Sequence, residues 1–126
     1  MFVRNLEDCP EFVAGDSSVL RELLHPAKAN LKIRYSLAHA KVPANQKTTP
    51  HKLLTSEVYY ILSGSGLMHI DRETQNVKTR CAIYIPPGAT QFIENTGDSD
   101  LEFLCIVDPA WQESDEIVLV AKSLKR

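Results

Sequence analysis

One histidine and one glutamate lie six residues apart in PHKLLTSEVYYILSG, the segment of residues 50–64. Imidazole nitrogens and carboxylate oxygens bind divalent metal ions, and both groups also move protons in general acid–base catalysis. Glu57 opens an apolar run that ends at Gly64, as a β-strand would before a turn. His51 and Glu57 therefore indicate a metal site, a metal site that has lost ligands, or a strand that carries two unrelated polar residues.

The elements that would position this pair are short strands. Proline, glycine, asparagine and aspartate recur at short intervals along the chain. Between them lie runs rich in Val, Ile, Leu, Tyr and Phe, at residues 31–42, 57–62, 66–71, 76–79, 82–86, 90–95 and 101–107. Many short strands at regular spacing are typical of an all-β sandwich or barrel, so we expect that fold class.

Alternation along these strands separates two faces. Successive side chains of a strand point to opposite sides, so Glu57 and Tyr59 share one face of the strand at 57–62. By the same rule Gln91 shares a face with Ile93. The strand at 57–62 is apolar on both faces, which fits a two-layer sheet or a face covered by a second subunit.

The segment around His51 resembles the first sequence motif of the cupin superfamily, G-x5-H-x-H-x3-4-E-x6-G. Anchored at Glu57 and Gly64, this motif places its first histidine at His51. Two positions differ, because Asn45 replaces the leading glycine and Leu53 replaces the second histidine.

The segment PPGATQFIEN, residues 86–95, resembles the second cupin motif, G-x5-P-x-G-x2-H-x3-N. Every spacing fits, but Gln91 occupies the histidine position and Arg80 the leading glycine position. Over residues 31–109 the chain thus resembles a small single-domain cupin of the "cupin 2" conserved-barrel type. The resemblance implies a double-stranded β-helix, or jelly-roll barrel, that is often dimeric and has a pocket, commonly with a metal, at one mouth.

In the usual site of this family, three imidazoles and one carboxylate bind a divalent ion and leave coordination positions open. Leu53 cannot bind a metal, and the amide oxygen of Gln91 is a weaker ligand than an imidazole. The resemblance therefore implies a reduced ligand set of His51, Glu57 and Gln91 for a divalent transition metal, with Fe, Mn, Ni, Zn and Cu as the candidates.

The same pocket would bind a small polar metabolite through Tyr59, Gln91 and Met68. In one interpretation the protein is an enzyme of isomerase or dioxygenase type, with His51 and Glu57 as catalytic residues and Glu57 as general base if no metal binds. In the alternative, a metal-free pocket of hydrogen-bonded side chains binds or senses a small molecule without chemistry. The sequence leaves both interpretations open.

Composition argues against several other classes of function. The chain has 126 residues, 44% of them hydrophobic, and a formal net charge of −2. Its basic residues are dispersed, so we expect no nucleic-acid or anionic-membrane partner. No apolar run reaches the length of a membrane span, and the N-terminus lacks the apolar core of a signal peptide. The three cysteines form no C-x-x-C pair, so we expect a reducing cytoplasm.

We expect a single domain over residues 1–126, made of an N-terminal strand or arm at 1–30, a conserved barrel at 31–109 and a C-terminal tail at 110–126. The segment DSSVLRELLHP could form a capped helical turn or a strand, and the strand is favoured. The tail could be helix or strand, since ESDEIVLVAKSLKR combines an N-cap with a β-rich run. The apolar strand faces predict a homodimer.

Overall fold

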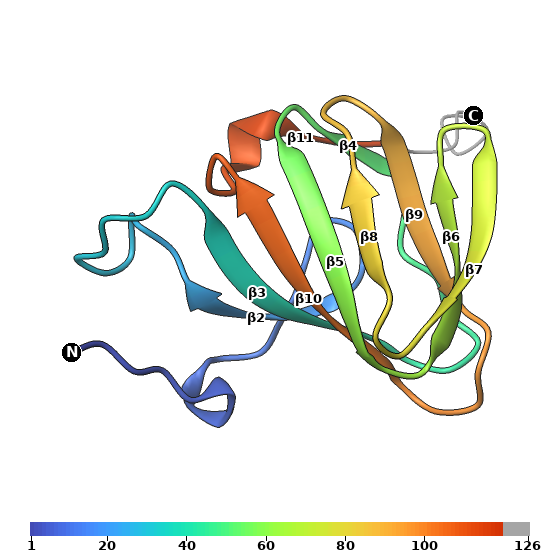
Figure 1. Cartoon of the computed structure of the whole chain (residues 1–126), viewed down its shortest axis with the longest axis horizontal. Helices are drawn as coiled ribbons and strands as arrows, with labels where there is room; N and C mark the ends of the chain where they lie inside the picture. The colour runs from blue at the N-terminus through green and yellow to red at the C-terminus, as the bar shows by residue number, and fades with distance from the viewer. Residues whose placement is uncertain (120–126) are drawn as a thin grey trace, which may run out of the picture.

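Two antiparallel β-sheets lie face to face in the computed structural model, which describes residues 1–119 (Figure 1). In spatial order the first sheet contains β1 (Phe12–Val13), β2 (Val19–Leu24), β3 (Ser36–Val42), β10 (Leu101–Asp108), β5 (Ser56–Ser63) and β8 (Ala82–Ile85). The second sheet contains β11 (Glu116–Val118), β4 (His51–Leu53), β9 (Thr90–Asn95), β6 (Ser65–Ile70) and β7 (Glu73–Lys78). Two 3-10 helices, η1 (Leu6–Asp8) and η2 (Glu113–Asp115), complete the described elements. The all-β jelly-roll prediction is confirmed.

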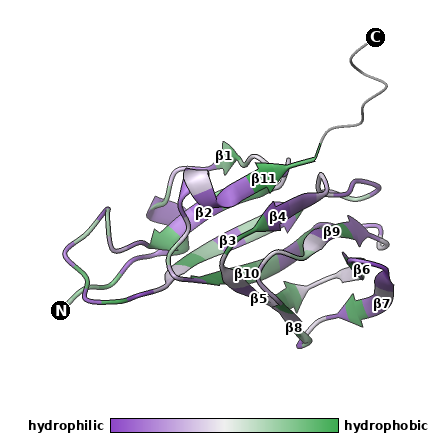
Figure 2. Ribbon diagram, turned by 90° about the horizontal axis from the view of Figure 1, so that it is seen from above, coloured by the Kyte–Doolittle hydropathy of each residue, from purple (hydrophilic) through white to green (hydrophobic). Residues whose placement is uncertain are grey.

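The path of the chain explains why distant motifs meet inside this barrel. From β3 to β11 each connection crosses between the sheets, except the hairpin from β6 to β7. Figure 2 shows the two layers from above, with the edge strands β7 and β8 at one end and β1 and β11 at the other. These crossings place β4 and β9, in the second sheet, and β5, in the first sheet, on opposite walls of one barrel.

Inward-facing side chains of both sheets form one apolar core. In β5, Tyr59 and Ile61 are buried while Tyr60 between them is 40% exposed, as strand alternation predicts. Tyr59 packs against Phe103 of β10, with ring centroids 4.4 Å apart. This packing fixes the inner face of β5, which also carries Glu57.

The glycine that ends the first motif occupies a tight connection. Gly64 joins β5 to β6 with a φ of 96°, and a Cβ at this position would lie 2.9 Å from the carbonyl oxygen of Asp100. Only glycine tolerates both the positive φ and the close approach. The apolar run that starts at Glu57 therefore ends where the chain must cross to the second sheet.

The central predicted strands are confirmed, and their bounds shift by a few residues at most. The exception is the run at 31–42, which is strand only from Ser36. Its first residues form a loop, because the Arg34 carbonyl oxygen accepts a hydrogen bond of 2.6 Å from the backbone of Ala110, after β10, rather than from a neighbouring strand. The sequence does not predict β4, since three residues after Pro50 are too short to show a period.

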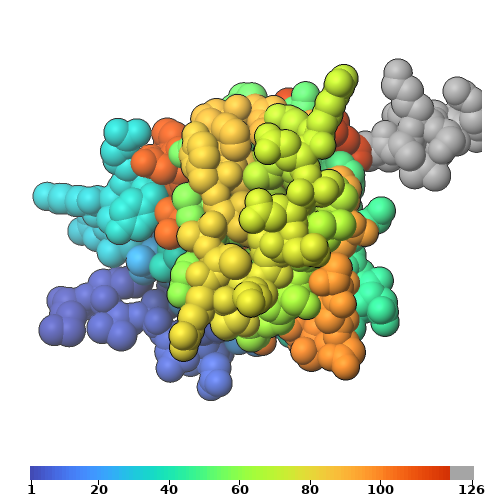
Figure 3. All heavy atoms as spheres, turned by 45° about the vertical axis from the view of Figure 1, so that its right-hand side comes forward, coloured from blue at the N-terminus to red at the C-terminus, as the bar shows by residue number. Residues whose placement is uncertain are grey.

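Both ends of the described chain join the sheets. The favoured strand at 16–26 is confirmed as β2, which pairs with β3, and the tail adds β11, which pairs with β4. The last seven residues of the tail, 120–126, lie outside the described residues. The first residues of the chain lie at the periphery, in blue in Figure 3, and no helix within residues 1–119 is long and apolar enough to cross a membrane.

We propose the outer face of the first sheet as the contact between two copies of the chain. Tyr60, Tyr84 and Ile106 are 40%, 62% and 38% exposed there, and strand pairing places them on the neighbouring strands β5, β8 and β10. Contiguous apolar faces of this kind mark interaction sites, and these uncharged side chains can pack against their own copy. Light scattering at micromolar concentration should show a homodimer, and Ile106→Glu should give a folded monomer.

Leu54 provides the control for this prediction. It is 57% exposed in the connection between β4 and β5, away from the proposed contact. Leu54→Glu should therefore stay dimeric, with the same circular dichroism spectrum as the unmodified chain. A monomeric unmodified chain would contradict the proposed contact.

Candidate functional site

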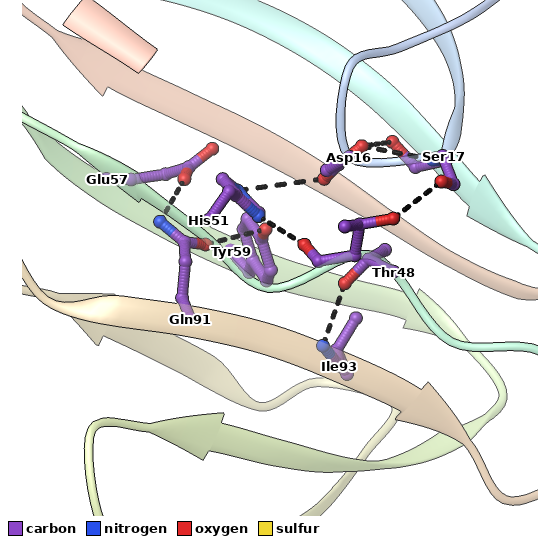
Figure 4. A network of polar contacts seen from close by, with 10 residues as sticks. Asp16, Ser17, Thr48, His51, Glu57, Tyr59, Gln91 and Ile93 are labelled. Atoms are coloured by element: carbon purple, nitrogen blue, oxygen red, sulfur yellow. Dashed lines mark hydrogen bonds and ion pairs between the residues drawn. The ribbon is translucent and has the colours of Figure 1, made fainter. Parts of the chain in front are cut away.

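Four of the five predicted site residues come together at one mouth of the barrel (Figure 4). His51 lies on β4 directly opposite Gln91 on β9, and Glu57 and Tyr59 lie on the inner face of β5. Met68 is not among them. Because β9 separates β6 from β4, Met68 packs in the core and lines a second cavity, of about 590 Å³, between β6, β7 and β8.

A buried hydrogen-bond chain links three of these side chains across the two sheets. The Tyr59 hydroxyl donates to Gln91 Oε1 at 3.0 Å, and Gln91 Nε2 donates to Glu57 Oε1 at 3.1 Å. Gln91 is fully buried, and Tyr59 and Glu57 are only 2% and 6% exposed. Both ends of the Gln91 amide are therefore engaged, and the amide fixes the position of the Glu57 carboxyl group.

His51 is held by the backbone on one side and faces an acid on the other. Its Nδ1 donates to the carbonyl oxygen of Thr49 at 2.8 Å. Its Nε2 therefore points away from the backbone and lies 3.8 Å from Asp16 Oδ2, too far for a hydrogen bond. The other carboxylate oxygen of Asp16 accepts hydrogen bonds from the backbone and hydroxyl of Ser18, at 3.0 and 2.6 Å.

The loop at residues 14–18, which carries Asp16, is tied down over the site. The Asp16 carbonyl oxygen accepts a bond of 2.6 Å from the backbone of Thr49, and the hydroxyls of Ser17 and Thr49 lie 2.7 Å apart. Ser17 has a φ of 77°, a strained value that the surrounding bonds maintain. Figure 4 shows this loop beside His51, where the segment before β4 holds it in place.

A cavity of about 240 Å³ lies beneath this loop. Most of the residues in its wall are apolar or aromatic, and they include Leu20, Leu53, Tyr59, Phe103, Val107 and Trp111. Its polar wall includes Asp16, His51, Glu57 and Glu116. Leu53, at the position of the missing histidine, thus forms part of an apolar wall.

Sequence reasoning did not identify Asp16 and Glu116 as site residues. In the sequence Asp16 opens a segment that could be a capped helical turn or a strand, and Glu116 lies in a tail of undecided structure. Both reach the cavity through long-range pairing, Asp16 through the loop bonded to Thr49 and Glu116 through β11 on β4. No local pattern reveals such contacts, although Asp-Ser-Ser is a common turn sequence.

The cavity changes the protonation of its acids. Burial, opposed by the hydrogen bond from Gln91 and assisted by the nearby charges of Asp16 and Glu116, raises the pKa of Glu57 to about 8. Burial also raises the pKa of Glu116, against the lowering effect of His51. Glu57 is therefore protonated at neutral pH, and since Oε1 accepts from Gln91, its other oxygen can donate a proton or a hydrogen bond into the cavity.

The reduced ligand set of His51, Glu57 and Gln91 does not fit a metal centre. The amide oxygen of Gln91 is buried and bonded to Tyr59, and the carboxyl group of Glu57 is held by the Gln91 amide. Throughout residues 1–119, no group of three or more His, Cys, Asp or Glu side chains is arranged to hold a metal ion. The hydrogen-bond chain takes the place of the missing imidazoles.

Comparison with known proteins agrees with this architecture. The model of the cupin domain family matches residues 38–107. An uncharacterized protein of Methanocaldococcus jannaschii is 44% identical over 109 residues, 86% of each chain, and an oxalate-binding protein of Thermotoga maritima is 33% identical over 113 residues, 85% of this chain and 93% of its own.

Two solved structures are also similar. A predicted oxalate decarboxylase from Thermotoga maritima has a TM-score of 0.74 at 26% identity, covering 86% of this chain and 99% of its own. A polyketide cyclase from Streptomyces resistomycificus has a TM-score of 0.80 at 19% identity, covering 97% and 87%, a likeness that shows the fold alone. Fold and site define a small jelly-roll barrel with a pocket at its mouth. The chain belongs to the cupin family.

The raised pKa of Glu57 predicts how stability depends on pH. The folded chain keeps this proton up to about pH 8, whereas the unfolded chain loses it near the ordinary value of 4.5. The folded state binds more protons in that interval, so the free energy of unfolding should fall between about pH 5 and pH 8. Glu57→Gln, which cannot ionise, should remove roughly 3–5 kcal/mol of this fall in denaturant titrations.

Glu73→Gln is the matched control, because Glu73 is an exposed glutamate on β7. This variant should keep the pH dependence of the unmodified chain. If Glu57→Gln also kept the pH dependence of the unmodified chain, Glu57 would ionise in the folded protein near its ordinary pKa. The description of Glu57 as a neutral buried acid would then be wrong.

Proposed function

We propose that the chain binds a small organic molecule in the cavity beneath residues 14–18, without a metal ion. The observation that carries this proposal is the cavity itself. Its wall is mostly apolar, and two buried polar residues, His51 and Glu57, line it. Apolar pockets with a few convergent polar groups, one of which has a displaced pKa, are typical ligand sites.

The size of the cavity limits the ligand. Its volume of about 240 Å³ is below the roughly 300–1,000 Å³ of pockets for drug-sized ligands. The ligand is therefore a small metabolite. Its apolar part would pack against residues such as Leu53 and Phe103, and a polar group would meet Glu57 or His51.

Oxalate, after which one relative is named, does not suit this cavity. Its two negative charges would lie close to the carboxyl groups of Asp16 and Glu116, which line the wall. The lysine at the wall, Lys28, already pairs with Glu22 at 2.5 Å. Bringing like charges together in a poorly solvated site costs several kcal/mol. We therefore do not extend oxalate binding to this chain.

Acid–base catalysis is the second candidate, and the pKa of Glu57 favours it. A general acid works best when its pKa is near the working pH, and the value of about 8 meets that condition. Glu57 could give a proton to a bound molecule, and His51, whose Nε2 lies on the cavity side, could take one up, as in an isomerisation. We place this activity in the cytoplasm, which the three free cysteines favour.

Filling the cavity tests the binding proposal. In buffer containing EDTA, calorimetry and thermal shift against a panel of small metabolites should yield at least one ligand. Ala38, half-buried on β3, lines the cavity, so Ala38→Phe should abolish this binding and leave the fold intact. Ala82→Phe, on the exposed side of β8, should bind as before. If no ligand binds, or binding requires an added metal, the proposal fails.

Product analysis separates catalysis from plain binding. If the second candidate holds, the bound molecule should be converted on long incubation, and Glu57→Gln should lower the rate at least a hundredfold while binding changes little. A ligand recovered unchanged would contradict catalysis and leave the binding proposal in place.

A further inference from the structure

We propose that the ligand of this cavity is a protonated organic amine with a short apolar body, whose ammonium group binds between Asp16 and Glu116. This inference rests on the proposed function, because it assigns a chemical class to the molecule that the cavity binds. It concerns two residues that lie outside the segment matched by the cupin family model, residues 38–107.

The two carboxyl groups lie close together at the cavity. Glu116 Oε1 lies against the backbone beside Asp16, since a Cβ built on Gly15 would be only 3.3 Å from it. Asp16 and Glu116 both line the cavity. Two acids that converge from different ends of the chain form a site for a positive charge.

One carboxylate oxygen of Asp16 makes no hydrogen bond within residues 1–119. Asp16 is 8% exposed, and its Oδ2 has only the distant contact of 3.8 Å with His51. Asp16 Oδ2 can therefore accept a hydrogen bond from a donor in the cavity. An ammonium group has three donors.

The charge balance of the wall selects a cation. Among the described residues that line the cavity, four are acids: Asp16, Glu22 and Glu116, and Glu57, which is protonated at neutral pH. The basic groups are His51 and Lys28, and Lys28 is engaged by Glu22. A carboxylate or phosphate ligand would find no free lysine or arginine among these residues, whereas an amine would find the carboxyl groups of Asp16 and Glu116.

The rest of the wall selects an organic cation over a metal ion. Tyr59, Phe103 and Trp111 line the cavity, and aromatic rings attract ammonium groups as well as apolar carbon. A bare metal ion would leave most of the 240 Å³ empty. The acids are also not arranged as a coordination group in residues 1–119.

Six probes test this assignment, in two sets of three that share the same carbon body and differ in the polar group. Butylamine, butanol and butyrate share one body, and benzylamine, benzyl alcohol and benzoate share another. In calorimetry we expect at least one amine to bind at least tenfold more tightly than its alcohol, and neither carboxylate to bind. Asp16→Asn and Glu116→Gln should each weaken amine binding about tenfold and leave alcohol binding unchanged. Glu113→Gln, an exposed neighbour in η2, should change nothing.

The outcomes distinguish the two proposals. If an alcohol or a carboxylate binds as tightly as its amine, and Ala38→Phe abolishes that binding, the cavity is a ligand site but the amine assignment is wrong. If no probe binds up to millimolar concentration, the amine assignment is overturned, and the metabolite panel decides the binding proposal separately. The side-chain amide introduced by Asp16→Asn can still accept the bonds from Ser18, and Glu116→Gln tests the assignment independently if Asp16→Asn fails to fold.

Discussion

The hydrogen-bond chain from Tyr59 through Gln91 to Glu57 is the interaction on which the site depends. It joins β5 in the first sheet to β9 in the second at the mouth of the barrel, with Gln91 fully removed from water. Each buried polar group left without a partner costs about 1–3 kcal/mol, so the three side chains constrain one another. Gln91 can complete the chain because its amide both accepts and donates.

The hydrogen-bond chain also determines which polar group faces the cavity. With one oxygen bonded to Gln91, Glu57 presents its other oxygen to an apolar space that keeps it protonated. The barrel that the family shares supplies this group together with His51. The added charge comes from outside the family match, where Asp16 and Glu116 reach the cavity from the two flanking segments. The barrel thus provides the acid–base pair, and the flanks provide the selectivity that we propose.

The resemblance of the two segments to the cupin motifs implies that His51, Glu57 and Gln91 come together. Alternation likewise places Tyr59 beside Glu57. Neither pattern predicts that Asp16 and Glu116 lie at the cavity. Their positions depend on the contacts of a loop with Thr49 and on the pairing of the three-residue strand β11 with β4. Alternation also shows that Met68 points inward, but the order of the strands decides which cavity it lines.

Metal content is the most direct test of this account. Protein purified without chelator, from cells grown with Fe, Mn, Ni, Zn and Cu, should contain far less than one divalent ion per chain by elemental analysis. Its content should not change in His51→Ala. About one ion per chain, lost in His51→Ala, would show that His51 binds a metal and would contradict the metal-free pocket.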